Sequence, residues 1–138
     1  MPIRQWNSSH LLNLYNAKKT KTLDDLLDFH VHFERIHPFQ DGNGRIGRLI
    51  LFKECLAAGI APFIITEDLK MFYYRGLQEW RHLNGYLTDT CLTAQDQYKA
   101  FLDYFRIDYS KEQLLSADEK GIMVHYNRVK FRTHFFRW

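Results

Sequence analysis

Apolar residues recur every three to four positions along most of the chain, which is the spacing of amphipathic α-helices. This pattern predicts five helices, over about residues 7–17, 22–37, 45–58, 66–80 and 85–107. Only 7 Gly and 3 Pro interrupt the 138 residues, which argues against a turn-rich β protein. We therefore predict an all-α fold, a helical bundle around one core.

The predicted helix ends carry recognisable signals. Thr22 is a good N-cap, and Asp25, three residues later, completes a variant of the capping box. Pro38 ends the second helix near His37, because a residue that precedes proline avoids the α region. Gly59 is a natural left-handed stop for the third helix. The second and third helices are apolar on more than one face, so we place both at the centre of the bundle.

The part of the chain after residue 107 has weaker patterns. Ser110 and Gln113 indicate a capping box for a short helix that ends at Gly121, and residues 122–138 alternate weakly like a strand. We therefore divide the chain into a core, residues 1–107, and a C-terminal segment, residues 108–138, that combines a short helix with a basic, aromatic tail.

Composition changes this picture little. Hydrophobic residues make up 46% of the chain and aromatic residues 16%, which excludes a disordered protein and allows a sizeable core. The net charge of +3 resides in the tail, where residues 120–138 hold five Lys or Arg and no acidic residue. Basic and aromatic side chains together could bind nucleic acid. We favour a packed or disordered terminus over this alternative, so nucleic acid is not an expected partner.

Several classes of protein and site are disfavoured. No apolar run approaches the roughly 20 residues that span a bilayer, and the N-terminus lacks the apolar stretch of a signal peptide. We expect a cytoplasmic protein with no membrane association. Cys55 and Cys91 lie inside apolar helical patterns without CxxC spacing, so we interpret them as buried, reduced thiols. His30 and His32 are interpreted as packing or surface residues and not as metal ligands.

One polar loop, residues 37–48, combines features that favour phosphate chemistry. Gly42 and Gly44 precede a helix, where free backbone N–H groups and the helix dipole attract anions. Arg45 and Arg48 are three residues apart in the first turn, so both can reach phosphate oxygens. Asp41 offers the hard carboxylate oxygen that Mg²⁺ prefers.

His37, at the start of this loop, can take up a proton near neutral pH. Each residue also has a simpler interpretation: a turn for the glycines, a helix C-cap for His37, an N-cap for Asp41, and surface ion pairs for the arginines. Twelve contiguous residues of this kind favour phosphoryl or nucleotidyl transfer instead.

The same segment resembles the signature of the Fic family, His-x-Phe-x-(Asp/Glu)-Gly-Asn-Gly-Arg-x-x-Arg. Its fixed positions are all met, by His37, Phe39, Asp41, Gly42, Asn43, Gly44, Arg45 and Arg48. The resemblance extends over about residues 22–107. It implies an all-helical domain that transfers AMP from ATP to a hydroxyl group of a target protein, with the motif loop between two central helices.

The resemblance also implies a role for each motif residue. His37 would deprotonate the incoming Ser, Thr or Tyr hydroxyl, and Asp41 would hold Mg²⁺ against the phosphates. Three residues would cradle the α- and β-phosphates, namely Gly42, Asn43 and Gly44. The two arginines would bind the outer phosphates, with Arg48 at the γ position. Phe39 would point inward and anchor the loop in the core.

Gly44 bears on the reaction type. Related Doc-type kinases carry Lys at this position and transfer phosphate, so Gly44 favours AMP transfer. Transfer of another nucleotide or of phosphate remains an alternative.

The chain departs from the family pattern upstream of the motif. Fic domains usually place a β-hairpin flap there, which pairs with the target protein, but nearly all of the 36 residues before His37 fit a helical pattern and none of them carries a hairpin signal. The chain therefore resembles an N-terminally incomplete Fic core. The alternative to an active enzyme is an inactive fragment that binds nucleotide or forms a homo-oligomer.

Regulation can also be predicted from the resemblance. Many Fic proteins inhibit themselves with a helix marked (Ser/Thr)-x-x-x-Glu-(Gly/Asn), whose glutamate pairs with the last motif arginine. None of the six glutamates has Ser or Thr four residues before it. We predict that Arg48 has no inhibitory glutamate partner in this chain, and an antitoxin-like protein is a candidate inhibitor.

Overall fold

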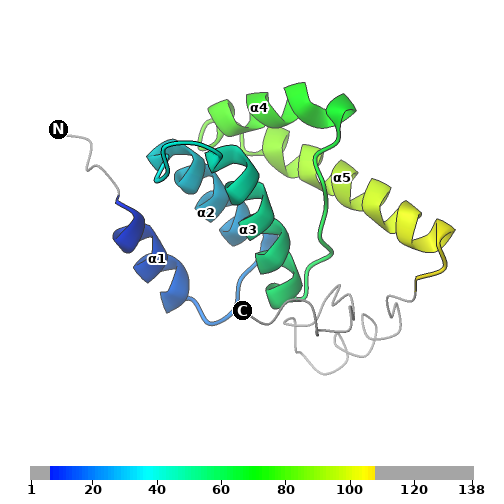
Figure 1. Cartoon of the computed structure of the whole chain (residues 1–138), viewed down its shortest axis with the longest axis horizontal. Helices are drawn as coiled ribbons and strands as arrows, with labels where there is room; N and C mark the ends of the chain where they lie inside the picture. The colour runs from blue at the N-terminus through cyan, green and yellow to red at the C-terminus, as the bar shows by residue number, and fades with distance from the viewer. Residues whose placement is uncertain (1–6, 108–138) are drawn as a thin grey trace.

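The computed structural model describes residues 7–107, and every element in this range is helical (Figure 1). The elements are α1 (Ser8–Ala17), α2 (Leu23–Ile36), α3 (Asn43–Ala58), the 3₁₀ turn η1 (Glu67–Leu69), α4 (Lys70–Glu79) and α5 (Gly85–Tyr104). The predicted all-α fold is confirmed for this part of the chain. The short helix expected over 110–121 and the basic tail lie outside the described residues.

The local signals set the helix ends as the sequence indicated. Thr22 and Asp25 form a reciprocal capping box, in which Asp25 Oδ2 accepts from the Thr22 N–H at 2.9 Å. Gly59 ends α3 in the left-handed conformation, with φ at 71°. The third helix starts at Asn43, two residues earlier than predicted, because Gly42 already turns the chain with φ at 75°.

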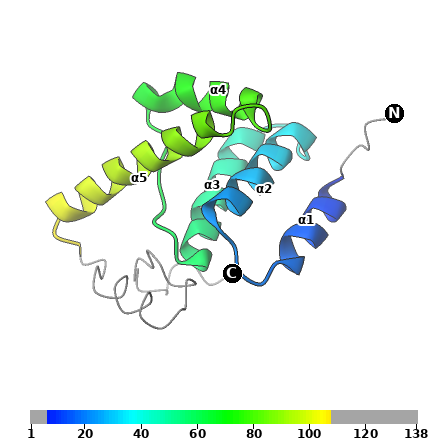
Figure 2. The same cartoon turned by 180° about the vertical axis from the view of Figure 1, so that it is seen from behind.

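The helices form two packed pairs, with one further helix at the side. α2 packs against α3, α4 packs against α5, and α2 also contacts α5 (Figures 1 and 2). The loop between α2 and α3 lies at the end of that pair next to α4 (Figure 1). No helix in residues 7–107 has the length and apolar character needed to cross a bilayer.

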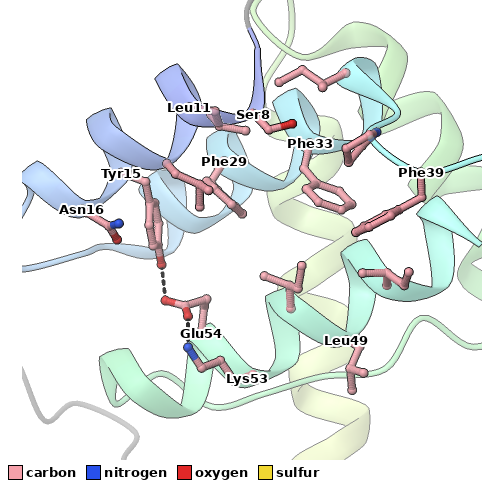
Figure 3. Close-up of a pocket in the computed structure, with 15 residues that line it drawn as sticks. Ser8, Leu11, Tyr15, Asn16, Phe29, Phe33, Phe39, Leu49, Lys53 and Glu54 are labelled. Atoms are coloured by element: carbon pink, nitrogen blue, oxygen red, sulfur yellow. Dashed lines mark hydrogen bonds and ion pairs between the residues drawn. The ribbon is translucent and has the colours of Figure 1, made fainter. Parts of the chain in front are cut away.

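An apolar cavity of about 710 Å³ separates α1 from α3, on the side of α2 where α1 packs (Figure 3). Phe33 and Phe39 lie close together at one end of it, with ring centroids 6.4 Å apart. At the other end, the Tyr15 hydroxyl donates to Glu54 Oε2 at 2.6 Å. The cavity is almost free of polar lining, so it is a poor site for phosphate.

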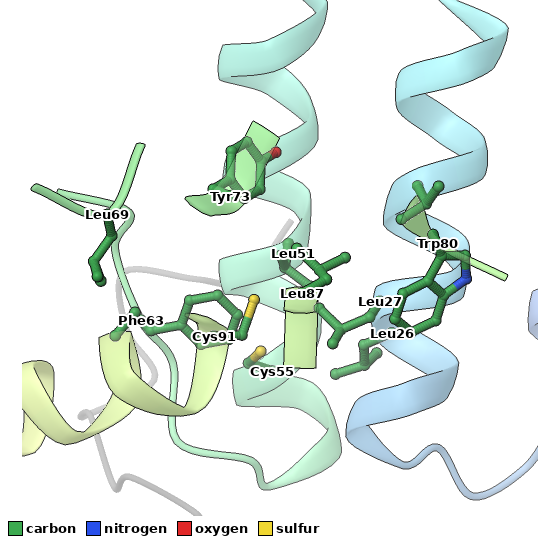
Figure 4. Packing of buried hydrophobic residues seen from close by; sticks show 12 residues of the cluster. Leu26, Leu27, Leu51, Cys55, Phe63, Leu69, Tyr73, Trp80, Leu87 and Cys91 are labelled. Atoms are coloured by element: carbon green, nitrogen blue, oxygen red, sulfur yellow. The ribbon is translucent and has the colours of Figure 1, made fainter. Parts of the chain in front are cut away.

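The core lies where α2, α3, α4 and α5 meet (Figure 4). Its largest contributors include Leu26, Leu27, Leu51, Phe63, Tyr73, Trp80 and Leu87. Cys55 and Cys91 are buried, unbonded thiols in this cluster, as predicted. His30 and His32 are buried as well, in agreement with the packing interpretation.

Some residues of the predicted apolar stripes are exposed. Phe101 and Phe105, in the apolar stripe of the last helix, lie on the surface, because the last turns of α5 extend beyond α4 (Figure 1). Phe72 on α4 and Leu49 on α3 are exposed for a related reason: each lies on the face of its helix directed away from the core. Helical spacing identifies an apolar face but does not say how far a partner covers it.

The helices α4 and α5 lie in close contact at Gly76. A Cβ atom built on Gly76 would lie 2.7 Å from the Leu87 Cα, which is shorter than any ordinary contact. Gly76 therefore sets the distance between these helices.

Candidate phosphate-binding and catalytic site

His37 ends α2 as its C-cap, in the left-handed conformation with φ at 53°. The simple C-cap interpretation of His37 is therefore correct, and it is compatible with a chemical role. His37 Nδ1 lies 2.7 Å from the Glu34 carbonyl oxygen. Because a carbonyl oxygen only accepts, Nδ1 carries the proton and donates it, which leaves the lone pair on Nε2. The exposed imidazole is thus held in the tautomer that a general base at Nε2 requires.

The Asn43 side chain forms two hydrogen bonds with the backbone of the motif loop. Its Oδ1 accepts from the Phe39 N–H at 2.9 Å, and its Nδ2 donates to the Phe39 carbonyl at 2.8 Å. The Asn43 side chain is 4% exposed, so it acts as a structural clamp on the loop. Neither the motif nor its spacing indicated this contact, although an amide can satisfy both groups of one residue at once.

Phe39 does not point into the core as the resemblance implied. It is 49% exposed and lies beside Phe33 at the edge of the apolar cavity. The loop is anchored through the Phe39 backbone, by Asn43, and not through the Phe39 ring.

Removal of the Asn43 clamp should loosen the loop. We expect Asn43→Ala to lower the free energy of unfolding by about 1–2 kcal/mol, because two backbone groups of Phe39 lose their partners. Hydrogen exchange should show faster exchange of the Phe39 amide. Gln40→Ala, at an exposed position of the same loop, serves as the control. An unchanged Phe39 exchange rate in Asn43→Ala would contradict the clamp.

The N-terminus of α3 offers unpaired backbone donors. The Ile46 N–H donates to the Gly42 carbonyl at 3.0 Å, and within residues 7–107 no acceptor pairs with the N–H groups of Asn43, Gly44 and Arg45. Gly42 differs, because its N–H donates to Asp41 Oδ1 at 2.6 Å. Three donors at a helix N-terminus are suited to an anion.

Both motif arginines extend back along α3 toward this N-terminus, as long helical side chains do. Arg48 Nη1 lies 3.2 Å from where a Cβ of Gly44 would be, and Arg45 Nη2 lies 3.6 Å from the corresponding point at Gly42. The absence of side chains at the two glycines therefore makes room for two guanidinium groups. Their charges add to the helix dipole at one end of α3.

Asp41 fits a magnesium ligand by its chemistry. Its carboxylate is almost fully exposed, with Oδ2 4.0 Å from Arg45 Nη2. No group of three metal-ligating side chains occurs in residues 7–107. Mg²⁺ commonly binds to one or two carboxylates together with substrate phosphates and water, and a single exposed carboxylate beside an anion site matches that pattern.

A largely buried polar cluster lies beside Arg48, with members on α2 and α4. His30 Nε2 and the Tyr73 hydroxyl share a hydrogen bond of 2.6 Å. Glu34 Oε1 lies 3.9 Å from the same nitrogen. Burial raises the pKa of the Glu34 carboxyl, and the Arg48 charge opposes this. This cluster has no signal in the sequence, because its members lie up to 43 residues apart.

Burial lowers the pKa of His30 to about 4. Between this value and the ordinary His pKa of about 6.5, the unfolded chain binds the proton and the folded chain does not. Above about pH 6.5, His30 is neutral in both states and does not lower the free energy of unfolding. As the pH falls from about 6.5 toward 4, the unfolded chain takes up a proton on His30 and the free energy of unfolding decreases. The raised pKa of Glu34 has the opposite effect on the free energy of unfolding as the pH falls. Tyr73 and Arg48 also lie near His30.

We expect the wild-type protein to lose about 2 kcal/mol more stability than His30→Gln between about pH 7.5 and pH 5. Urea unfolding at both pH values measures this, and the shared remaining groups cancel in the comparison. Equal losses in the two proteins would show that His30 is not held neutral by burial.

Ion pairing of Arg48 bears on the predicted regulation. Within the described residues, no ion pair joins Arg48 to Glu34, Glu54, Glu67 or Glu79. Glu112 and Glu119 lie outside that range. The absence of an inhibitory partner in the whole chain stays a prediction.

The motif segment is similar to known proteins of one family. Residues 3–54 match the model of the Fic/DOC family. A protein adenylyltransferase Fic of Drosophila virilis is 33% identical over 69 residues, which are 50% of this chain and 14% of that protein. One of Aedes aegypti is 43% identical over 49 residues, or 36% of this chain and 10% of that protein.

A probable protein adenylyltransferase of Aquifex aeolicus is 50% identical over 38 residues, which are 28% of this chain and 12% of that protein. The matched parts thus cover at most 14% of these three relatives. No solved structure gave a significant match.

Proposed function

We propose that the chain transfers AMP from ATP to a hydroxyl group of a target protein, on the premise that residues 3–54, which match the model of the Fic/DOC family, form part of a Fic domain. The relatives named protein adenylyltransferase support this reaction type. The observation that carries the proposal is the tautomer of His37, with Nδ1 bound to Glu34 and Nε2 left to accept a proton, next to a helix N-terminus with two arginines.

In the proposed reaction, His37 Nε2 accepts the proton of a Ser, Thr or Tyr hydroxyl on the target. The hydroxyl oxygen then bonds to the α-phosphorus of ATP. The bond between the α-phosphorus and the oxygen that bridges to the β-phosphorus breaks, and pyrophosphate leaves. AMP is left on the target side chain. One proton is thus held by His37 until it passes to solvent or to product.

The residues around α3 would stabilise the phosphates. The free N–H groups of Asn43, Gly44 and Arg45 would donate to phosphate oxygens, and the charges of Arg45 and Arg48 would offset those of the β- and γ-phosphates. Mg²⁺, bound through Asp41 and the phosphates, would supply positive charge against the departing pyrophosphate. The proposed roles of these residues follow the motif.

Labelled ATP tests the proposal directly. The chain is incubated with Mg²⁺, a cell lysate and ATP that carries the label on either the α- or the γ-phosphate. We expect the α-label to appear on protein and the γ-label to stay in solution. Transfer of the γ-label would establish phosphate transfer instead. ATP binding without transfer of either label would establish the inactive, nucleotide-binding alternative.

The same reactions address the proposed partners. A labelled band other than the chain itself identifies a target protein, and a labelled band of its own mass indicates self-modification. An antitoxin-like inhibitor and a homo-oligomer remain expectations, which addition of lysate fractions and light scattering would test.

A further inference from the structure

The connector between α3 and η1, residues 60–66, has no regular secondary structure and runs from the end of α3 to the start of η1 and α4 (Figure 1). Side chains of α5 bind it at both ends. Near its start, Gln95 Nε2 donates a hydrogen bond to the Ala61 carbonyl oxygen at 2.7 Å. At its end, the Thr66 hydroxyl donates to Gln97 Oε1 at 3.3 Å. These two contacts hold the connector in place against the bundle.

The middle of the connector has free backbone groups. Within the described part of the chain, the N–H and C=O groups of Phe63, Ile64 and Ile65 take part in no hydrogen bond. Their side chains alternate as in a strand: Phe63 is 5% exposed, Ile64 is 58% exposed, and Ile65 packs against the core. Because unpaired backbone groups in a fixed, extended segment can pair with another segment, residues 63–65 resemble the open edge of a sheet.

An apolar hollow of about 420 Å³ lies between the connector and α3. Leu49, which is 56% exposed, and Phe52 contribute to its α3 side. Arg48 also lines it, but the guanidinium extends toward the N-terminus of α3, with Nη1 3.2 Å from where a Cβ of Gly44 would lie. The exposed Ile64 and Leu49 side chains therefore border a hollow that apolar side chains can fill.

One segment outside the described residues has the sequence pattern of a strand with one apolar face. Residues 128–132, Arg-Val-Lys-Phe-Arg, alternate strictly between basic and apolar side chains. In an extended conformation, Val129 and Phe131 share one face and the three basic residues share the other. Such a strand needs an apolar surface on one side and solvent on the other.

Charge favours the surface around the connector for this basic segment. Five of the 19 Lys and Arg residues lie within residues 120–138, so the other 14 are outnumbered by the 16 acidic residues, all of which precede this range. Glu67 and Asp68 directly follow the connector and are exposed. Glu67 pairs with Lys70 at 3.5 Å, whereas Asp68 has no cationic partner within the described residues. The segment and this surface are therefore complementary in charge.

The chain is also long enough to reach the connector. Gln97, which binds the end of the connector, lies about two turns before the end of α5 at Tyr104, or about 11 Å along the helix axis. Residues 108–127, which precede the alternating segment, can span up to about 66 Å at about 3.3 Å per residue. The segment can therefore fold back onto the connector of its own chain.

We propose that residues 128–132 pair with residues 63–65 as an added strand, with Val129 and Phe131 in the hollow against α3 and the basic side chains on the outer face. The pairing satisfies the free N–H and C=O groups of the connector and covers the exposed Ile64 side chain. The inference is independent of the proposed AMP transfer, because none of these residues acts in that reaction.

Hydrogen exchange on the intact chain tests the pairing. We expect at least one amide of residues 63–65 to exchange at least about tenfold faster in Phe131→Asp than in the wild type, because strand pairing protects alternate N–H groups. Phe135→Asp introduces the same charge outside the alternating segment and should leave these rates unchanged. Equal rates in the wild type and Phe131→Asp, or an equal acceleration in both variants, would overturn the inference.

A spin label measures the proximity of the two segments directly. In Lys130→Cys the introduced thiol is the reactive one, because Cys55 and Cys91 are buried. A label at this position leaves the apolar face of the segment unchanged. We expect it to broaden the NMR signals of residues 63–65 more than those of α1, which borders the larger apolar cavity. Uniform broadening, or stronger broadening at α1, would show that the segment does not pack on the connector.

Mixed samples distinguish pairing within one chain from pairing between two copies. Isotope-labelled wild-type protein is combined with spin-labelled Lys130→Cys protein that carries no isotope label. We expect the signals of residues 63–65 to stay sharp in this mixture. Broadening there would show that the segment crosses to a second copy, and it would overturn the proposed pairing within the chain.

Discussion

Replacement of His37 by alanine is expected to lower AMP transfer by at least about 10²-fold while ATP affinity changes less than twofold. The rate should fall because the target hydroxyl loses the group that takes its proton, and general-base catalysis typically contributes about 10²–10⁴. Binding should persist because His37 is not among the phosphate donors of α3. Transfer of the α-label and calorimetric titration with ATP measure the two quantities.

A matched control separates this effect from a change in fold. His82→Ala removes another exposed histidine, in the loop between α4 and α5, and should leave transfer unchanged. The imidazole of His37 also helps to cap α2, so unfolding of both variants is compared first. A His37→Ala protein that is folded, binds ATP and transfers AMP at the wild-type rate would refute the role of general base.

Replacement of Gly76 by valine is expected to lower the free energy of unfolding by about 3 kcal/mol or more. The added Cβ would lie 2.7 Å from the Leu87 Cα, and a backbone atom cannot move aside as the end of a side chain can. The pair α4–α5 must therefore separate, which disturbs the packing of Tyr73, Trp80 and Leu87 in the core. Chemical denaturation measures the loss, and Gly76→Ala should give a smaller one.

Gly85→Val is the control for this substitution. Gly85 is the first residue of α5, and nothing lies within 4 Å of the position of its missing Cβ. We expect a change within about 0.5 kcal/mol, as for surface substitutions in general. Similar losses at Gly76 and Gly85 would mean that the close approach of α4 and α5 is not the cause.

The helices could be predicted from the sequence because their signals are local. The capping box of Thr22 and Asp25 and the left-handed stop at Gly59 depend on residues within one turn, and the structure has both. The exposure of Phe101 and Phe105 could not be predicted, because it depends on where the neighbouring helix ends. Local chemistry sets where a helix stops, and tertiary packing sets what it covers.

The sequence predicts which residues form the candidate site, but it does not predict the contacts that those residues make. The motif indicated the residues from His37 to Arg48, and their roles in binding and catalysis stay predictions. Two contacts had no sequence signal. Asn43 binds the Phe39 backbone, and Glu34 lies against Gly47. The first needs the loop conformation, and the second needs the packing of α2 on α3.

The rate at which a reagent labels the two buried thiols would measure how often the folded structure opens. Cys55 and Cys91 are the only cysteines of the chain, and burial raises the pKa of each well above the usual thiol range. A thiol reagent can therefore modify either residue only after the surrounding structure opens. Cys55 belongs to the α2–α3 pair and Cys91 to the α4–α5 pair. Equal labelling rates would mean that the two helical pairs open as one cooperative unit, and unequal rates would reveal which pair opens first.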